Sequence, residues 1–396
     1  MRPNRLISTI ALTVFIALTA FTSSRAEDEK PRPPASHSAL NIGVNGFGLS
    51  FGNSQRHNGL RINVSDRDLL AVNGLNLTLW KPKDNPDAVI NGIAVGVLGP
   101  VAGEINGVAA GSIAVVAEDA LRGISLSGIA VVSSGEMIGI HAGGIAAVSD
   151  GGLIGLGFGG LAVETDGDLR GIGIGGLATA ANRIQGIALG GLAVIAEEGI
   201  DGATSAGLAV VSTKSVRGVH IAGLAVVSER WVEGINLGGL GVVGDHGIKG
   251  LASSIFAIQS DGDIRGVVTG AIGIPGKNRH SREWQLLGIH GRNIAGLAVH
   301  GMTIKAEERF TGVGVAGLRT RTGRLTGLGV AALVHSDLLQ GCSIGVINLV
   351  GKSQSGLSVG VFNHARSLNG VQIGLLNYVA DNPPLLRLLP ILNVHL

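Results

Sequence analysis

A glycine returns at an almost constant interval through the middle of the chain. Each lies sixteen residues after the previous one, except for two steps of fifteen. A fixed period of this length is typical of repeat architectures, in which each unit packs only against its neighbours. We therefore expect one elongated array rather than the two or three globular domains that 396 residues would otherwise suggest. The leading glycines are Gly92, Gly107, Gly123, Gly139, Gly155, Gly171, Gly186, Gly202, Gly218, Gly234, Gly250 and Gly266.

Each unit contains two short segments with strand-like alternation. Counting the leading glycine as position 1, positions 2 and 4 are mostly Ile, Val or Leu, and position 6 is usually glycine. Positions 7 and 9 are apolar, position 8 is nearly always Ala, and positions 11 to 14 are mostly polar. Residues two apart share one face of a strand, and glycine at position 6 permits a turn. The pattern predicts an all-β fold, a narrow repetitive β-solenoid with about 16 residues and two strands per coil.

An outer-membrane β-barrel is the alternative fold. Its strands carry apolar residues toward lipid, polar residues toward the lumen, and aromatic girdles at both interfaces. Here positions 7 to 10 are apolar on both faces, and aromatic residues make up only 3% of the chain. A helical fold is disfavoured, because each interior glycine costs a helix about 1 kcal/mol. The solenoid, which we favour, predicts parallel coils with the leading glycines in one row, about 4.8 Å apart.

The same pattern assigns an inside and an outside to each coil. We expect position 3 to face outward, which places His141 and His220 on the surface. We also expect Ala at position 8 and Val at position 10 to form an outward stripe, which offers a surface for self-association because a long apolar stripe is usually covered. Examples of this stripe are Ala130 with Val132 and Ala209 with Val211. The expected core residues are Leu126, Ile129, Leu161, Leu177, Leu192, Leu208 and Leu224.

The N-terminus has the features of a signal peptide. A basic segment ending at Arg5 precedes an apolar segment from Leu6 to Phe21, and Ser24 and Ala26 supply small residues for cleavage after Ala26. The apolar segment is shorter than the ~20 residues that a spanning helix needs, although an uncleaved anchor is the alternative interpretation. We therefore predict an exported protein. Its single cysteine, Cys342, allows no disulfide within the chain.

The remaining boundaries follow from changes in the repeat. We expect a signal peptide at 1–26, a disordered, proline-bearing leader at 27–39, and N-terminal capping strands at 40–91. The regular 16-residue array covers 92–274, and a polar insertion covers 275–290. C-terminal repeats follow at 291–378, and a proline-bearing cap closes the chain at 379–396.

The insertion is the most basic stretch within the array. An irregular loop on a regular scaffold is a common place for binding residues. We therefore consider it a candidate binding loop, with a tolerated bulge as the structural alternative. Its candidate residues are Lys277, Arg279, His280, Arg282 and Trp284.

The last coils share an asparagine that the central coils lack. Asn348, Asn363 and Asn377 each lie seven residues after a leading glycine. In stacked coils such side chains lie one above another, and their amides can form a hydrogen-bonded ladder. We therefore predict a structural asparagine ladder near the C-terminal end.

The segment from Asn369 to Asn377, NGVQIGLLN, and the proline-bearing tail from Pro384 to Leu396 resemble a family of exported bacterial surface-repeat proteins. The resemblance is best from Gly341 to the end, and the stretch from Val72 to Pro100 is also similar. The central coils have GLAV where the family favours GLN. The resemblance implies an exported or surface location and no established biochemical activity, so it assigns no functional residues.

No catalytic or metal-binding pattern is present in the sequence. The histidines form no HxxxH or HExxH pair, and a net charge of +2 gives no electrostatic footprint for nucleic acid. We expect no enzyme activity, cofactor, metal or nucleic-acid partner. The chain is interpreted as an exported structural repeat protein that presents an extended surface, at the cell surface, outer membrane or periplasm of a bacterium. Its expected partner is a cell-envelope component or a host or surface ligand. The alternatives are an outer-membrane barrel that acts as a channel or anchor, and an adhesin or glycan-binding module.

Overall fold

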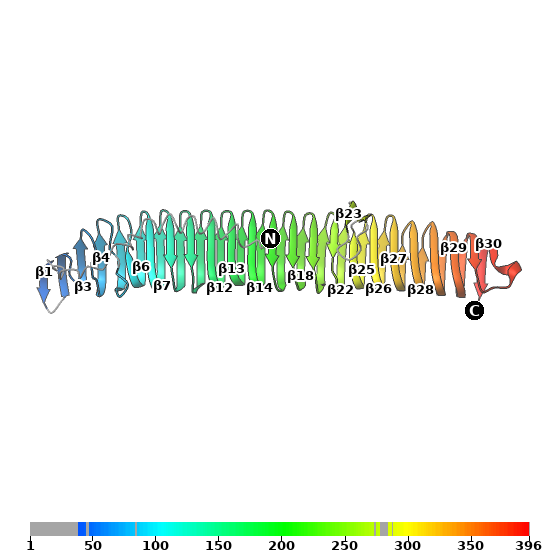
Figure 1. Cartoon of the computed structure of the whole chain (residues 1–396), viewed down its shortest axis with the longest axis horizontal. Helices are drawn as coiled ribbons and strands as arrows, with labels where there is room; N and C mark the ends of the chain where they lie inside the picture. Colours follow the sequence, from blue (N-terminus) through cyan, green and yellow to red (C-terminus); the bar gives the residue numbers. More distant parts are fainter. Residues whose placement is uncertain are drawn as a thin grey trace, which may run out of the picture.

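The computed structural model describes residues 39–44, 47–83, 85–272, 275–277, 284–286 and 288–395. The chain forms a long rod of stacked coils (Figure 1), a β-solenoid of about 18 turns with roughly 16 residues per coil. No α-helix occurs in the described ranges, and a single 3-10 turn, η1 (Pro384–Leu386), lies near the C-terminal end. The predicted fold class is therefore confirmed.

Some strands stay within one side of a coil, and others continue through the bend into the next coil. The strands are β1 (Ala39–Val44), β2 (Phe47–Gly52), β3 (Arg56–Asn63), β4 (Ala71–Thr78), β5 (Val89–Gly96), β6 (Val101–Gly111), β7 (Ala114–Ser127), β8 (Ala130–Ser133), β9 (Glu136–Gly143), β10 (Ala146–Ser149), β11 (Gly152–Gly159), β12 (Ala162–Gly175), β13 (Ala178–Gly190), β14 (Ala193–Ala206), β15 (Ala209–Ser212), β16 (Val216–Ala222), β17 (Ala225–Ser228), β18 (Trp231–Gly238), β19 (Gly241–Gly244), β20 (Gly247–Ser254), β21 (Ala257–Gln259), β22 (Asp263–Gly270), β23 (Pro275–Lys277), β24 (Trp284–Leu286), β25 (Ile289–His300), β26 (Thr303–Ala316), β27 (Arg319–Val330), β28 (Leu333–Ile344), β29 (Ile347–Val379) and β30 (Leu388–His395).

One central coil shows the plan of the others. Its first strand, β9, carries the leading glycine, and a turn at positions 6 and 7, here Gly144 and Ile145, leads into the second strand, β10. A polar turn at Asp150 and Gly151 then leads into β11, which starts the next coil. β9 pairs in parallel with β11, and β10 pairs in parallel with β8 and β12. Consecutive coils therefore run parallel, as the solenoid requires, and the antiparallel alternative is not adopted.

The leading glycines lie in one row because each is pressed against the glycine of the coil before it. Gly139 is opposite Gly155, and Gly155 is opposite Gly171. Gly155 has φ of +122°, and a β-carbon added to it would lie 2.1 Å from the carbonyl oxygen of Gly139. A side chain is thus excluded by both the backbone conformation and the available space.

The row of glycines begins before the regular array. Gly48, Gly59 and Gly74 lie in register with one another, and Gly74 lies in register with Gly92. β2, β3 and β4 are therefore parallel rungs of the same solenoid. β1 pairs with β2 in the antiparallel sense and covers the N-terminal end. At the other end, β30 pairs antiparallel with the last part of β29.

The core is a thin layer between the two strands of each coil, filled from positions 3, 9 and 15. Position 15 supplies the bulkiest buried side chains, such as Leu153 and Phe310, both fully buried. Position 3 varies in volume to compensate for position 15. Gly157 lies beside Leu153, whose Cδ1 is 2.5 Å from where a β-carbon on that glycine would lie, and His220 has the smaller Val216 four residues earlier.

The predicted core assignment was wrong: Leu126, at position 4, is one residue out of phase, and the other six residues, at position 7, lie in the turn between the two strands and not in the core with position 9. The seven side chains expected in the core are 36–50% exposed, with Leu126 at 50% and Leu192 at 46%. His141 and His220, expected at the surface, are fully buried. The physical reason is the narrow interior: position 15 already fills it next to the first strand, so position 3 turns inward and the bulky residues at positions 2 and 4 point outward.

The outward stripe predicted at positions 8 and 10 is confirmed only in part. Ala209, Val211 and Val132 are partly exposed on the outer side of the second strand. Ala130, by contrast, is 1% exposed and belongs to the buried set. The large exposed apolar side chains lie instead at positions 2, 4 and 7.

The phase of the core leads to a direct mutational prediction. Leu153→Ala removes a buried side chain opposite Gly157, which leaves a cavity that no neighbouring side chain fills, so the loss of stability should be about 2–5 kcal/mol. Leu192→Ala removes a half-exposed side chain and should cost well under that range. Urea denaturation of the two variants measures the difference. An equal loss in both would contradict the burial pattern described above.

The two buried histidines predict a pH dependence of stability. Burial lowers the pKa of His141 and of His220 from 6.5 to about 4. As the pH falls, the unfolded chain takes up protons on these side chains before the folded chain does. The free energy of unfolding should therefore hold its full value above about pH 6.5 and decrease between pH 6.5 and 4, by about 3 kcal/mol for each histidine.

His220→Asn tests this dependence, because Asn236 occupies the same position in the next coil. We expect urea midpoints of this variant to change less between pH 7 and pH 4.5 than those of the unmodified protein. His246→Asn, which replaces an exposed histidine, is the matched control and should leave the pH dependence unchanged. An identical pH dependence in all three proteins would show that His220 is not held neutral in the core.

Candidate functional site: an apolar edge

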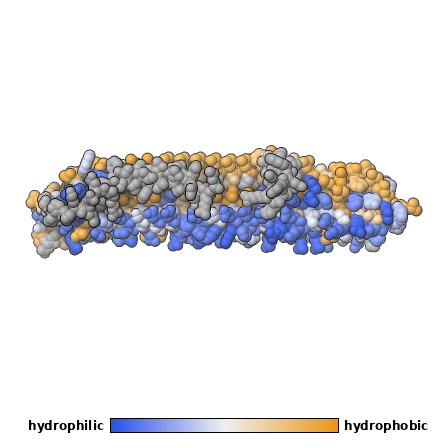
Figure 2. All heavy atoms as spheres, in the orientation of Figure 1, coloured by the Kyte–Doolittle hydropathy of each residue, from blue (hydrophilic) through white to orange (hydrophobic). Residues whose placement is uncertain are grey.

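Apolar side chains cover one long side of the rod. Figure 2 shows them gathered along that side, with hydrophilic side chains along the opposite side. We call the surface formed by positions 2, 4 and 7 of the coils the apolar edge. Its exposed members include Ile93, Val95, Val108, Ile124, Leu126, Ile129, Ile140, Phe158, Leu161, Leu177, Ile187, Leu189, Leu192, Leu208, Val219, Ile221, Leu224, Ile235, Leu240, Leu251, Val267, Ile272, Leu297, Val299, Val313, Val315 and Leu318.

The edge results from the way the outer face of the first strand is divided. Positions 2 and 4 lie toward the turn at positions 6 and 7, and most of them are aliphatic. Positions 14 and 16 lie toward the polar turn, and position 16 is often charged in the central coils. Arg217 and Lys249, for example, form ion pairs with Glu233 at 3.3 and 3.0 Å. The rod is therefore amphipathic across its width, and this division is repeated along its length.

Ionisable side chains are nearly absent from this half of each coil. Positions 1 to 10 of the twelve units that start from Gly92 to Gly266 contain a single Asp, Glu, Lys or Arg, which is Glu164 at position 10. Burial raises the pKa of Glu164, and the nearby Asp166 and Asp150 raise it further. The charges of the array are thus confined almost entirely to the polar turn and to positions 14 and 16.

The size of the edge sets it apart from ordinary surface variation. About 18 coils at ~4.8 Å per coil give a strip roughly 80 Å long, and positions 2 and 4 alone make it about 7 Å wide. The strip therefore covers more than roughly 500 Å², and the side chains at position 7 widen it. Soluble monomers seldom expose continuous apolar patches of this size unless the patch binds something.

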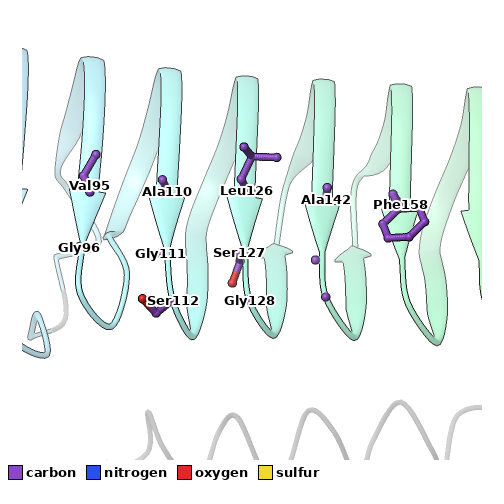
Figure 3. Close-up of a pocket in the computed structure, with 12 residues that line it drawn as sticks. Val95, Gly96, Ala110, Gly111, Ser112, Leu126, Ser127, Gly128, Ala142 and Phe158 are labelled. Atoms are coloured by element: carbon purple, nitrogen blue, oxygen red, sulfur yellow. The ribbon is translucent and has the colours of Figure 1, made fainter.

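Two shallow hollows lie on the edge. The first, of about 460 Å³, forms where Ala110 and Ala142 stand in the row otherwise occupied by Val95, Leu126 and Phe158 (Figure 3). The second, of about 630 Å³, lies over the C-terminal coils and is bordered by aliphatic side chains and the glycines of the turns. Both hollows have mostly apolar linings, so they suit hydrocarbon better than polar ligands.

A basic cluster borders the apolar edge in the C-terminal third of the chain. It consists of Lys305, Arg319, Arg321 and His335 on the outer side of the second strand, where central coils carry Ala and Val. Lys305 is opposite Arg321, and Arg321 is opposite His335, in three successive coils. Sequence reasoning missed this cluster, although the change from Ala-x-Val to Arg319-x-Arg321 at positions 8 and 10 was a usable signal.

The two arginines dominate the electrostatics of the cluster. Among the described residues, neither Arg319 nor Arg321 forms an ion pair, and Nε of Arg319 is buried without a hydrogen-bond partner. Burial lowers the pKa of Arg319, and Arg321 lowers it further. Burial also lowers the pKa of His335, with contributions from Arg321 and Arg319, while Asp337 acts in the opposite direction. Lys305 differs from the two arginines, because Glu307 lies 3.8 Å from its Nζ.

The predicted binding loop is only partly described. Lys277 ends β23 and Trp284 begins β24, and these two residues pair in a short antiparallel ladder. Arg279, His280 and Arg282 lie outside the described residues. The insertion follows Ile272, a residue of the apolar edge. It therefore leaves the solenoid beside the candidate binding surface.

The three asparagines are brought together as a ladder in the core. Asn348 donates from Nδ2 to Oδ1 of Asn363 at 2.8 Å, and Asn363 donates in the same way to Asn377 at 2.7 Å. All three side chains are buried. Each also donates to a backbone carbonyl: Asn348 to Val359, Asn363 to Ile373, and Asn377 to both Gly374 and Leu389.

The ladder coincides with a shorter turn. In the central coils the inward residue of the second strand lies eight residues after the leading glycine, as Val131 does after Gly123, whereas Asn348 lies only seven after Gly341. The shortened turn brings the amide within reach of a carbonyl at position 4 of the next coil. The asparagines thus supply hydrogen bonds that an aliphatic side chain at this position could not supply.

A second buried polar network, at the N-terminal end, was not predicted. Arg61 is fully buried and forms an ion pair with Asp66, and its guanidinium also donates to Asn76 at 2.8 Å. Asp66 accepts from Asn63, Asn76 and Thr78. Its partners come from two neighbouring rungs, β3 and β4, so the network ties these coils together.

Neither a metal-binding cluster nor a membrane-spanning helix is found within the described ranges. The side chains there form no group of three or more His, Cys, Asp or Glu placed to hold a metal ion. The same part of the chain contains no helix with the length and hydrophobicity that crossing a bilayer requires.

The geometry of the ladder predicts different effects for its middle and end rungs. Within the ladder, Asn363→Ala removes both the donor to Asn377 and the acceptor of Asn348, while Asn377→Ala removes only the acceptor of Asn363; each variant also loses its hydrogen bonds to backbone carbonyls. Each buried polar group left without a partner costs about 1–3 kcal/mol. Hydrogen exchange between Gly341 and Tyr378 should therefore increase more in Asn363→Ala than in Asn377→Ala. Equal protection in the two variants would refute a cooperative ladder.

The chain was compared with known protein families, with curated proteins and with solved structures. None of the three comparisons found a match.

Proposed function

We propose that this protein is an exported, non-enzymatic repeat protein of a bacterial cell envelope or surface, and that its apolar edge is an extended binding surface. The observation that carries the proposal is the continuous edge of half-exposed aliphatic side chains. Such side chains contain no acid, base or nucleophile, so the chemistry of the edge is that of contact and burial.

Energetics favour an edge that is covered in the cell. Each Å² of apolar surface removed from water contributes roughly 25 cal/mol. The strip of more than roughly 500 Å² therefore represents a large contact energy that is unused while the edge remains exposed. A rigid scaffold also favours binding, because its side chains lose little conformational entropy when a partner covers them.

The export part of the proposal comes from the sequence. The basic and apolar segments before Ala26 lie outside the described residues, and their order is that of a signal peptide. The coils from Gly341 onward resemble repeats of exported surface proteins. A rod held together by its backbone ladder and core, with no need for disulfides, is suited to such a location.

Paired cysteine labelling tests the proposal. In a Cys342→Ser background, Leu224→Cys places a thiol on the apolar edge, and Arg230→Cys places one on the polar side of the same coil. Fractionation first shows where the protein resides. We expect it in an envelope, surface or medium fraction, with Val14→Arg in the apolar N-terminal segment abolishing export.

A maleimide is then applied to the fraction that contains the protein and to the purified protein. We expect the Leu224→Cys thiol to react several-fold more slowly in the cell fraction than in the purified protein, because its partner covers it. The Arg230→Cys thiol should react equally in both. Equal reactivity of both thiols in every preparation, or retention of the protein in the cytoplasm, would refute the proposed function.

A further inference from the structure

The apolar edge is convex. In the coil that starts at Gly186, Leu189 lies on the outer face of the first strand, Leu192 lies at the turn, and Ile195 lies on the outer face of the second strand. These two faces look in opposite directions, because the core lies between the strands. The apolar surface therefore wraps around the turn, and a flat partner can contact only one of its sides at a time. A fluid hydrocarbon phase can cover both sides.

The backbone N–H groups of the turn are bonded to the neighbouring coil. The N–H of Leu161 donates to the carbonyl of Ile145 at 2.7 Å, the N–H of Leu177 donates to Leu161 at 2.7 Å, and the pattern continues to Leu192 at 2.7 Å. The N–H of Gly160 likewise donates to Gly143, one coil earlier. A hydrocarbon environment tolerates backbone only when its polar groups are bonded internally. The N–H groups of the edge meet this requirement through the coil-to-coil ladder.

The basic cluster gives the edge a charge preference. Arg319 directly follows Leu318, a 44% exposed member of the edge, and Arg321 lies two residues further along the same strand face. Lys305 and His335 flank Arg321 in the neighbouring coils. Cations placed just outside an apolar surface match the layer of headgroups that borders the acyl chains of a bilayer.

A second copy of the chain is the alternative occupant, and the geometry favours it less. A second rod could pack against positions 2 and 4, but it would leave position 7 and the outer side of the second strand exposed. It would also offer no acid to Arg319 and Arg321, because the edge of the central coils carries no charge apart from Glu164. An anionic lipid bilayer can cover both sides of the convex edge with acyl chains and can also place negatively charged headgroups beside the cations.

We propose that the apolar edge lies in the surface of a lipid bilayer that contains anionic phospholipids, with the aliphatic side chains of positions 4 and 7 among the upper acyl chains and the basic cluster against the headgroups. The inference rests on the proposed function, since it names the partner that covers the same edge. The rod lies along the membrane and does not cross it, and the polar side faces water.

Vesicle sedimentation tests the inference with the purified full chain. One set of vesicles contains phosphatidylcholine alone, and the other contains about one third phosphatidylglycerol. We expect binding to the mixed vesicles to be at least tenfold stronger, and to weaken as salt screens the charges. Leu177→Asn, Leu192→Asn and Leu208→Asn, combined in one variant, should reduce this binding more than tenfold while its urea midpoint stays close to that of the unmodified chain.

The contribution of the cluster is tested with a charge-matched control. Arg319→Gln combined with Arg321→Gln should weaken binding to mixed vesicles by about fivefold for each arginine and leave binding to phosphatidylcholine unchanged. Arg122→Gln combined with Arg170→Gln removes the same charge from position 16 and should change binding less than twofold. Equal losses in the two pairs would mean that net charge alone attracts the protein, which would overturn the role of the cluster.

Insertion is measured by fluorescence. In a background with Trp80, Trp231 and Trp284 replaced by Phe, a tryptophan at Leu192→Trp should be quenched by bromine-labelled acyl chains, and one at Arg230→Trp should not. Two results would overturn the inference: no sedimentation with either vesicle, or dimers in solution that the triple asparagine variant converts to monomers, which would identify a second copy as the occupant. Slow labelling of the edge in cells together with no vesicle binding would leave the proposed function in place and reject the lipid partner.

Discussion

The close contact between successive leading glycines sets the geometry of this molecule. The carbonyl oxygen of each glycine occupies the space that a β-carbon on the next one would need. Adjacent coils can therefore approach to the strand spacing at this column, and the register of every strand is fixed by it. The row runs from Gly48 to Gly370, so one repeated steric constraint aligns the core, the apolar edge and the charged positions over the whole rod.

The repeat period was sufficient to predict the solenoid and its parallel stacking, because period and strand length leave few other arrangements. The inside and outside of each coil were harder to predict. Positions 2 and 4 are the most regularly aliphatic, which favours placing them in the core, yet position 15 is equally regular and occupies that space first. Volume decides between them: Gly157 fits only because Leu153 fills the interior beside it, and such compensation between positions 15 and 3 cannot be recognised from hydrophobicity alone.

Some features of the candidate site could be predicted from the sequence, and others could not. The asparagine ladder was foreseeable because identical residues at one offset must stack in stacked coils. The apolar edge was not, since it follows from the corrected phase. Arg61 and Asp66 lie in an irregular part of the chain, where no repeat relates them, so their buried pairing depends on tertiary contacts that spacing does not encode. Both ends of the rod thus have polar networks within the core, while the centre relies on aliphatic packing.

Variation in unit length is confined to one side of the regular array. In the two fifteen-residue units the strand register shifts between Ala102 and Glu104 and between Ala181 and Arg183, both in the polar turn. The opposite turn keeps its length there, so the spacing of the edge is unbroken. A gene duplication that adds one unit therefore extends the edge by one strand spacing and leaves both ends intact. Affinity for any extended partner then changes by a nearly constant factor per unit, which lets evolution adjust binding strength by copy number, with no new contact to be invented.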